Sequence, residues 1–310
     1  WGIDAISKFN GIFAFAIYDE KNRRIVLARD AMGVKPLFYS IKNDTFIFGS
    51  EVKSLFKHPY VEPVVDKDGL TELFALGPAV IPGTTVYKDI NEVKPGEYLI
   101  VNEFGLKKDM YWELKAKEFN ESEEEAIEHV RELLTDAIRR QLVGDVPLCT
   151  FLSGGLDSSA ISAIAAEEYK KKNKVLTTYS IDYEDNEKYF KSSLFQPTSD
   201  KYYAEVMAKY IGSDHRTVVL NHTDLVNALI GRDLPGMADV DSSLYLFCKE
   251  VKKDFVIALS GECADELFGG YPWFTNEEMI NSNTFPWSRF IGERKAILSP
   301  ELKSLKIEEV

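Results

Sequence analysis

Two segments of the chain hold most of the side chains that could do chemistry. The first, residues 153–159 (SGGLDSS), places two glycines, three hydroxyls and one carboxylate directly after an apolar run. Glycine lets the backbone approach a polyanion, and the N–H groups that open a helix favour negative charge. Asp157 would repel a bare phosphate, but its carboxylate could hold Mg²⁺ that bridges phosphate oxygens. The segment predicts a phosphate-binding loop, with an ordinary Gly-rich turn as the alternative.

The second segment, residues 260–271 (SGECADELFGGY), contains three carboxylates within five residues, Glu262, Asp265 and Glu266. Grouped carboxylates repel one another and are unfavourable unless they face a metal ion or a cationic group. The segment predicts a metal-binding or substrate-binding loop, and a solvated acidic turn is the alternative. Residues 153–159 lack the Lys of the GxxxxGK[ST] motif, which excludes a Walker-type loop.

Strands and helices alternate around both segments. Strands are predicted over residues 146–152, 175–181, 217–220 and 255–259, and helices over 158–170, 201–211, 224–230 and 242–251. This alternation predicts an α/β fold with a doubly wound parallel sheet. Ligands of such sheets bind at the carboxyl ends of the strands, so the site is expected just after Leu152, Ile181 and Leu259.

The first third of the sequence has a different pattern. Short apolar runs bounded by turn residues predict an α+β fold with antiparallel sheets, with strands over 12–18, 24–28, 37–41, 45–48 and 97–101 and helices over 51–56 and 67–76. Residues 113–125 are polar and acidic, as expected between domains, and Ser122 with Glu125 forms a capping box. We therefore predict two domains, residues 1–115 and 122–310.

Composition and charge exclude several classes of protein. The 310 residues are 45% hydrophobic and carry a formal net charge of −13, which opposes non-specific binding to nucleic acid or to an anionic membrane. No apolar run approaches the roughly 20 residues that cross a bilayer. The 3 cysteines show no CxxC spacing, which favours reduced thiols and a cytoplasmic location.

The two segments carry a family resemblance. Residues 153–159 resemble the pyrophosphate loop of the ATP pyrophosphatases, and residues 260–271 resemble the SGxGADExFGGY signature of asparagine synthetases. Residues 27–39 (LARDAMGVKPLFY) are similar to the RDxxGxKPLYY stretch of class II glutaminase domains. Nearly the whole chain is thus similar to the glutamine-hydrolysing asparagine synthetase family, as an internal fragment. The resemblance implies part of an Ntn-hydrolase-type glutaminase followed by an ATP-pyrophosphatase domain of the adenine nucleotide alpha hydrolase-like type.

The resemblance also implies a role for individual residues. The adenosine pocket would be lined by Leu152, Ile181, Ser260 and Gly261. The pyrophosphate would lie on Ser153, Gly154, Gly155, Asp157 and Ser158. Mg²⁺ would be bound by Asp157 and Asp265, while Glu262 and Glu266 would handle aspartate, the β-aspartyl-AMP intermediate or ammonia. Residues 233–243 match the loop ahead of the last helix, with Pro235 and Gly236 fixing its turn and Ser242 able to cap that helix. Contact of this loop with the substrate is the alternative to a purely structural cap.

The implied activity is an ATP-dependent ligase that makes asparagine from aspartate and glutamine-derived ammonia and releases AMP and pyrophosphate. Its partners would be aspartate, glutamine or ammonia, and ATP, and a homodimer stays open. The alternatives are an amide-forming or β-lactam-forming relative with another carboxylate substrate and a non-catalytic nucleotide-binding homologue.

The chain departs from the family at two positions. Class II glutaminases use an N-terminal Cys, whereas Trp1 stands first here, so this piece alone is not expected to hydrolyse glutamine. Cys263 replaces a glycine of the signature, and its carboxylate neighbours are expected to raise the pKa of its thiol. Read without the family, Arg29 and Asp30 are a structural pair after a strand.

Overall fold

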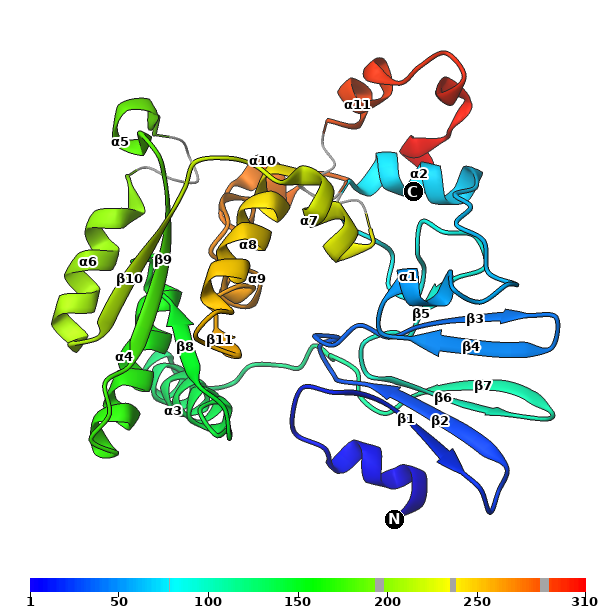
Figure 1. Cartoon of the computed structure of the whole chain (residues 1–310), viewed down its shortest axis with the longest axis horizontal. Coiled ribbons are helices and arrows are strands. Elements are labelled where there is room, and N and C mark those ends of the chain that lie inside the picture. Colours follow the sequence, from blue (N-terminus) through cyan, green and yellow to red (C-terminus); the bar gives the residue numbers. More distant parts are fainter. Residues whose placement is uncertain (78, 193–197, 235–237, 285–289) are drawn as a thin grey trace. The chain divides into compact units, whose positions relative to one another are not determined.

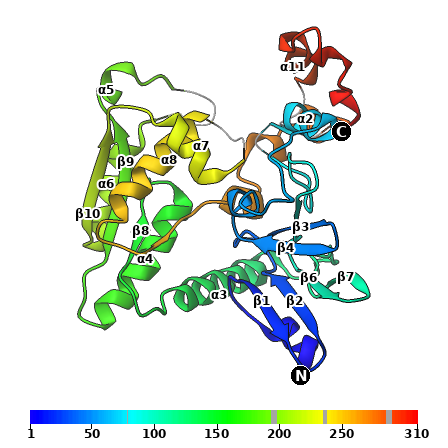
Figure 2. The same cartoon turned by 45° about the vertical axis from the view of Figure 1, so that its right-hand side comes forward.

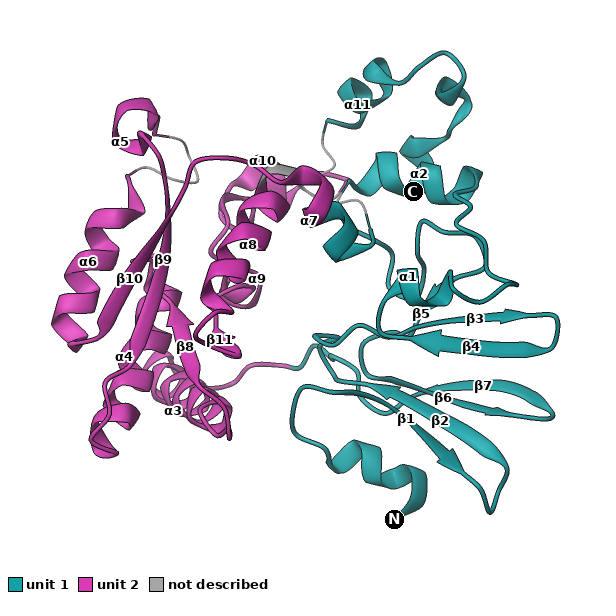
Figure 3. Cartoon of the chain, viewed as in Figure 1, with its two compact units in different colours: residues 1–117, 229–237, 287–310 teal, residues 118–228, 238–286 magenta. Residues whose placement is uncertain are grey.

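The computed structural model describes residues 1–77, 79–192, 198–234, 238–284 and 290–310. The chain divides into two compact units, drawn in Figure 3: unit 1 comprises residues 1–117, 229–237 and 287–310, and unit 2 comprises residues 118–228 and 238–286. Residues 229–237 and 287–310 therefore belong to unit 1, whereas the predicted division into 1–115 and 122–310 places them in the second domain. The assignment of two domains to those ranges stays a prediction.

Two antiparallel sheets form the body of unit 1 (Figure 1). The first contains, in spatial order, β1 (Ala14–Asp19), β2 (Arg24–Arg29), β6 (Glu97–Asn102) and β7 (Gly105–Met110). The second contains β4 (Thr45–Gly49), β3 (Phe38–Lys42) and β5 (Asn91–Glu92). The predicted α+β class with antiparallel sheets is confirmed, while β5 and β7 were not predicted.

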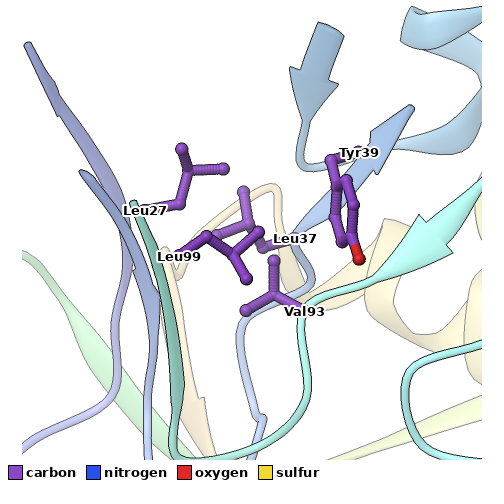
Figure 4. Close-up of a cluster of buried hydrophobic side chains, with 5 residues drawn as sticks. All are labelled: Leu27, Leu37, Tyr39, Val93 and Leu99. Carbon is purple, nitrogen blue, oxygen red and sulfur yellow. The ribbon is translucent and has the colours of Figure 1, made fainter. Parts of the chain in front are cut away.

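A buried apolar cluster joins the two sheets of unit 1 (Figure 4). Leu27 of β2 and Leu99 of β6 are fully buried and pack with Tyr39 of β3, together with Leu37 and Val93. Successive side chains of a strand point to opposite faces. Phe38 accordingly faces a second cluster, which includes both ends of α1 (Val52–Leu55). Alternation along β3 thus explains both the core between the sheets and the helix on the outer face.

Short helices complete unit 1. They are η1 (Gly2–Lys8), α2 (Lys67–Leu76), α11 (Ile291–Ile297), η4 (Leu302–Ser304) and η5 (Ile307–Glu309). The Asp66 side chain caps α2 by accepting the N–H of Gly69 at 3.0 Å. Ala75 of α2 packs against Leu298, Leu305 and Ile307, so residues near the end of the chain cover this helix.

Unit 2 is built on a four-stranded sheet whose pairs are all parallel. Its spatial order is β10 (Asp214–Leu220), β9 (Thr177–Tyr183), β8 (Leu148–Phe151) and β11 (Ile257–Leu259). Phe247 and Val251 of α8 (Ala238–Val251) pack on Cys149 and Tyr179 of one face. The other face is covered by α4 (Leu156–Lys171) and α6 (Asp200–Ile211), as Figures 1 and 2 show. The predicted doubly wound parallel sheet is confirmed.

The remaining helices of unit 2 are α3 (Glu123–Gln141), α5 (Asn186–Tyr189), α9 (Ala264–Phe268), η2 (Pro272–Phe274) and α10 (Glu277–Ile280). The helix α7 (Leu225–Arg232) begins in unit 2, and its residues 229–232 belong to unit 1. The predicted capping box is present at the start of α3: Ser122 accepts the N–H of Glu125 and Glu125 accepts the N–H of Ser122. Within the ranges described above, no helix combines the length and the apolar character that a membrane span requires.

The prediction that Ser242 caps the last helix is wrong. That helix, α8, begins at Ala238, so Ser242 lies in its second turn rather than ahead of it. The Ser242 hydroxyl instead accepts the N–H of Asp224 at 2.7 Å, immediately before α7. Pro235 and Gly236, to which the preceding turn was assigned, lie outside the described residues.

Candidate functional site

The strand order of the parallel sheet places a crevice between β8 and β11. The chain moves outward on one side from β8 through β9 to β10, then returns to the other side of β8 for β11. Ligands of open parallel sheets bind outside the carboxyl ends of the strands at the point where the strand order reverses in this way. The loops that follow β8 and β11 are residues 152–155 and 260–263, which contain the starts of both predicted segments.

The two loops touch each other. A Cβ added at Gly261 would lie 3.1 Å from the Cβ of Asp157 and 3.1 Å from the backbone nitrogen of Ser158. Such a separation is tighter than ordinary van der Waals contact, so a larger residue at 261 would push the two loops apart. Glycine at position 261 therefore lets the second loop close onto the first turn of α4.

A cavity of about 450 Å³ opens at this junction. The predicted site residues that line it are Leu152, Ser153, Gly155, Asp157, Ser158, Ile181, Ser260, Gly261, Glu262 and Asp265. Gly154 of the first loop and Glu266 of α9 do not line the cavity. The structure thus brings together most of a set that the sequence spreads over more than a hundred residues.

Hydroxyl groups fix the shape of the first loop. The Ser158 side chain accepts the N–H of Ser153 at 3.2 Å, lies 3.0 Å from the Ser153 hydroxyl and donates to the Gly155 carbonyl at 3.2 Å. No described side chain caps α4, whose N-cap is Gly155. Its first N–H groups are available to an anion, because helix N-termini carry unsatisfied donors and a positive dipole end.

The carboxylates of the cavity fit a cation held together with a phosphate. Asp157 in the first turn of α4 and Asp265 in the first turn of α9 line the same cavity. Across the described ranges, no group of three or more His, Cys, Asp or Glu side chains is arranged to hold a metal ion by itself. Mg²⁺ in nucleotide sites is bound by one or two carboxylates, with phosphate oxygens and water completing its shell. This pair has the composition that such a Mg²⁺ requires.

Glu266 does not line the cavity; it is exposed on α9 and bonds to Tyr271. The Tyr271 hydroxyl donates to Oε1 of Glu266 at 3.2 Å, and Tyr271 itself lines the cavity. Burial, followed by the charge of Glu266, raises the pKa of Tyr271 to about 12. The phenol therefore keeps its proton at neutral pH and remains a donor.

Cys263 stands in the wall with an unusual backbone. Its φ of +69° is in the left-handed region, where glycine is favoured. Burial raises the pKa of its thiol, and the carboxylates of Glu266 and Glu262 add to this effect. The predicted direction is confirmed, although burial is the larger cause. A raised thiol pKa makes Cys263 a poor nucleophile at neutral pH.

Several lining residues had no predicted role. They are Ser180, Tyr183, Asp200, Lys201, Ala204, Val240, Leu244 and Tyr271, along with neighbouring apolar residues. Asp200 and Lys201 open α6, and Val240 and Leu244 lie on α8. The helical period of the sequence predicts which residues share a face of these helices. It does not predict which strand ends the helices approach. Of these lining residues, Tyr271 and Val240 had a sequence signal, since Tyr271 closes the second segment and Val240 lies within residues 233–243.

Comparisons with known proteins identify the family of the chain. The family model described as glutamine amidotransferase domain matches residues 1–112, and the one described as asparagine synthase matches residues 129–308. Asparagine synthetase [glutamine-hydrolyzing] 3 of Bacillus subtilis is 49% identical over 315 residues, covering 100% of this chain and 51% of the relative. Asparagine synthetase [glutamine-hydrolyzing] 1 of the same organism is 32% identical, covering 86% of this chain and 41% of the relative.

A relative with another name is more distant. Amidase chry2 of Gibberella zeae is 27% identical, covering 90% of this chain and 42% of the relative. The chain spans about half the length of the curated relatives it matches. Because the asparagine synthase model matches residues 129–308, which is more than half of the 310 residues, the chain belongs to the asparagine synthase family.

Proposed function

We propose that the protein carrying this chain uses Mg-ATP to activate the side-chain carboxylate of aspartate and forms asparagine with ammonia derived from glutamine. The observation that carries the proposal is the contact of the β8 and β11 loops around one cavity that Asp157, Glu262 and Asp265 line. Family membership and the similarity to glutamine-hydrolysing synthetases support the choice of aspartate and glutamine as substrates.

The chemistry follows from the poor leaving group of a carboxylate. An oxygen of the aspartate carboxylate attacks the α-phosphorus of ATP, the bond from that phosphorus to the bridging oxygen breaks, and pyrophosphate leaves. Ammonia then attacks the acyl carbon, AMP leaves with the shared oxygen, and the nitrogen loses a proton. Negative charge that develops on the phosphates needs nearby donors. The first N–H groups of α4 and the Ser153 and Ser158 hydroxyls are such donors.

We propose the following roles within the cavity. The adenosine would contact Leu152, Ile181, Ser260 and Gly261, and the pyrophosphate would lie on Ser153, Gly154, Gly155, Asp157 and Ser158. Asp157 and Asp265 would hold Mg²⁺, which when bound neutralises phosphate charge. Glu262 faces the cavity and is suited to aspartate or ammonia, whereas Glu266, which does not line the cavity, would act through Tyr271.

We further propose that residues 1–115 form the C-terminal part of a glutaminase domain and residues 122–310 a synthetase domain, in agreement with the two family models. A cytoplasmic location accords with the free thiols of Cys149, Cys248 and Cys263. A homodimer, if formed, would be seen by light scattering.

A different acceptor is the second candidate. Cys263 places a side chain in the cavity wall at a left-handed position, where glycine would leave more room. Because the Gly-rich loop is intact, the nucleotide site is expected to be unchanged. The side chain of Cys263 would instead alter the fit of the carboxylate substrate.

The experiment that tests the proposal is aspartate-dependent release of AMP and pyrophosphate from Mg-ATP by the protein that carries this sequence, given glutamine or ammonium. Turnover with both nitrogen sources is expected. Pyrophosphate release that ignores aspartate would assign the site to another carboxylate, and failure to bind Mg-ATP would refute adenylation altogether. Asp157→Asn should abolish pyrophosphate release without changing the unfolding temperature, whereas Glu132→Gln, an exposed carboxylate of α3, should change neither.

A further inference from the structure

The first turn of α6 lies beside the Gly-rich loop. A Cβ added at Gly154 would lie 2.5 Å from the backbone nitrogen of Ala204, so loop and helix are in direct contact there. Lys201 precedes Ala204 by three residues and therefore lies on the same face of the helix. Both residues line the cavity. The contact at Gly154 thus brings the Lys201 side chain next to the loop on which the phosphates are proposed to lie.

The charges of the cavity wall are unbalanced. Of the described residues that line it, four are carboxylates, Asp157, Asp200, Glu262 and Asp265, and one is a cation, Lys201. A nucleotide triphosphate is a polyanion, and carboxylates alone would repel it. One Mg²⁺, if held by Asp157 and Asp265 as proposed, would offset part of this repulsion. Among the described side chains of the wall, Lys201 is the one whose positive charge can offset more of this repulsion.

The contacts of Lys201 keep it charged and leave it able to move. Its Nζ lies 3.3 Å from Oε1 of Glu187 and 3.7 Å from Oδ2 of Asp182. Hydrogen bonding to Glu187, followed by the charges of Glu187 and Asp182, raises the pKa of the Lys201 ammonium. The Glu187 side chain is 83% exposed, and exposed ion pairs contribute little free energy. A phosphate could therefore replace Glu187 as the partner at little loss.

Asp182 is the neighbour of Lys201 that is held firmly in place. Its side chain is 10% exposed, and its Oδ1 accepts the side-chain N–H of Asn186 at 2.8 Å and the N–H of Tyr183 at 2.9 Å. The carboxylate is thus held in place by β9 and α5 while its other oxygen faces Lys201. A long flexible side chain with one fixed neighbour can swing its ammonium towards a ligand without leaving the site.

Resting on the proposed function, we infer that Lys201 binds the phosphate chain of the nucleotide. Its ammonium carries three donors and no acceptor, so it can bond to a phosphate oxygen while it stays near Asp182. Such a charge-assisted bond is stronger than a neutral one. Lys201 would therefore contribute to the affinity for nucleotides with a phosphate chain and not to the affinity for the nucleoside.

The test compares binding of ATP and of adenosine by isothermal titration calorimetry, in the presence of Mg²⁺, for the protein that carries this sequence. Lys201→Gln should weaken ATP binding about tenfold, which corresponds to about 1.4 kcal/mol, and leave adenosine binding unchanged. Lys201→Arg should restore most of the ATP affinity. Lys209→Gln is the matched control, because Lys209 is exposed on the same helix and does not line the cavity.

The outcomes separate this inference from the proposed function. ATP binding by the unaltered protein with equal affinity in the Lys201→Gln variant would overturn the inference and leave the proposed function standing. Equal losses of ATP and adenosine affinity, without rescue by Lys201→Arg, would show a structural role and would also overturn it. An unaltered protein that binds no ATP would overturn both.

Discussion

Gly154 and Ala204 lie in direct backbone contact, although 50 residues of sequence separate them. The Cβ that another residue would bring to position 154 would lie 2.5 Å from the Ala204 nitrogen and 2.6 Å from two atoms of Tyr203. The φ of Gly154 is +88°, a conformation that residues with a Cβ rarely adopt. Glycine at position 154 can adopt this φ and also leaves room for α6 to approach the loop.

The first prediction concerns this contact. Gly154→Ala should destabilise the protein by about 1–3 kcal/mol, because the new methyl group meets backbone that cannot yield and the left-handed conformation is strained. The loop should move, and ATP affinity should fall about tenfold or more. Urea unfolding and calorimetric titration would measure the two effects.

Gly155→Ala is the control for the strain. Its φ is −70°, and the nearest atom to an added Cβ is the Ser153 hydroxyl oxygen at 3.5 Å, an ordinary contact. This variant should unfold within about 1 kcal/mol of the parent. Equal stability of the Gly154 and Gly155 variants would show that α6 can move away from the loop.

The second prediction concerns Arg29, which is 6% exposed at the end of β2. Its guanidinium donates to the carbonyls of Lys35 at 2.8 Å, Val93 at 2.7 Å and Gly33 at 2.6 Å, and it pairs with Glu92 at 2.7 Å. Asp30, 1% exposed, accepts three N–H groups of the same turn. These contacts support the interpretation of the pair as structural.

Arg29→Lys should therefore lower the free energy of unfolding by about 3 kcal/mol, because an ammonium cannot reach several carbonyls in one plane and leaves buried acceptors unpaired. Chemical denaturation would measure this loss. Arg24→Lys at the other end of β2 is the matched control, since Arg24 is partly exposed and, among the residues that the structure describes, pairs with Asp19. A similar, small effect of both substitutions would argue against a structural role for Arg29.

The sequence predicts the fold well because the hydrophobic period is set locally. The helix predicted over 67–76 coincides with α2, and β2, β3, β4 and β6 lie within one or two residues of their predicted ranges. The strand β7 was missed because five of its six residues, all except Leu106, are exposed and the pattern lacks a buried face. Ala238 to Asp241 were missed as helix because a turn was expected there.

The site is less predictable, since it depends on contacts between distant elements. The motif at 153–159 indicates a phosphate loop because the composition of the loop itself carries the signal. Nothing in the local sequence around Lys201 distinguishes it from Lys209 on the same helix. Only the packing of Gly154 on Ala204 shows which of the two lies at the cavity.

The third prediction concerns Tyr271 and Glu266. Tyr271→Phe removes the donor that lies 3.2 Å from Oε1 of Glu266 and keeps the ring. If Glu266 handles aspartate or ammonia, turnover should fall about threefold to tenfold, in line with the roughly 1 kcal/mol of a partly exposed hydrogen bond. The unfolding temperature and ATP affinity should not change.

Tyr202→Phe supplies the control, because Tyr202 is 66% exposed on α6 and does not line the cavity. Steady-state rates with ammonium as nitrogen source measure the effect without the glutaminase step. Identical rates for the parent and both variants would show that Tyr271 does not position Glu266.

The fourth prediction concerns a chain of hydroxyls around His215 on β10. Thr178 Oγ1 lies 2.8 Å from Nδ1 and Ser180 Oγ lies 3.1 Å from Nε2, so both ring nitrogens have partners on β9. Ser180 also lines the cavity. Burial lowers the pKa of His215 below its ordinary value of 6.5, and the charges of Glu205 and Asp214 oppose this shift without reversing it.

The pH dependence of stability follows from that direction. The unfolded chain protonates His215 at a higher pH than the folded chain does, so it binds more protons as the pH falls below 6.5. The contribution of neutral His215 is therefore complete above pH 6.5 and decreases as the pH falls towards the lowered pKa of the folded state. His215→Gln should reduce stability at pH 7.5 by about 1 kcal/mol through weaker hydrogen bonds. Because glutamine does not titrate, the variant should also lose less stability than the parent between pH 6.5 and pH 5. Urea unfolding across this range would measure both effects, and parallel curves for the two proteins would show that His215 titrates alike in the folded and unfolded chains.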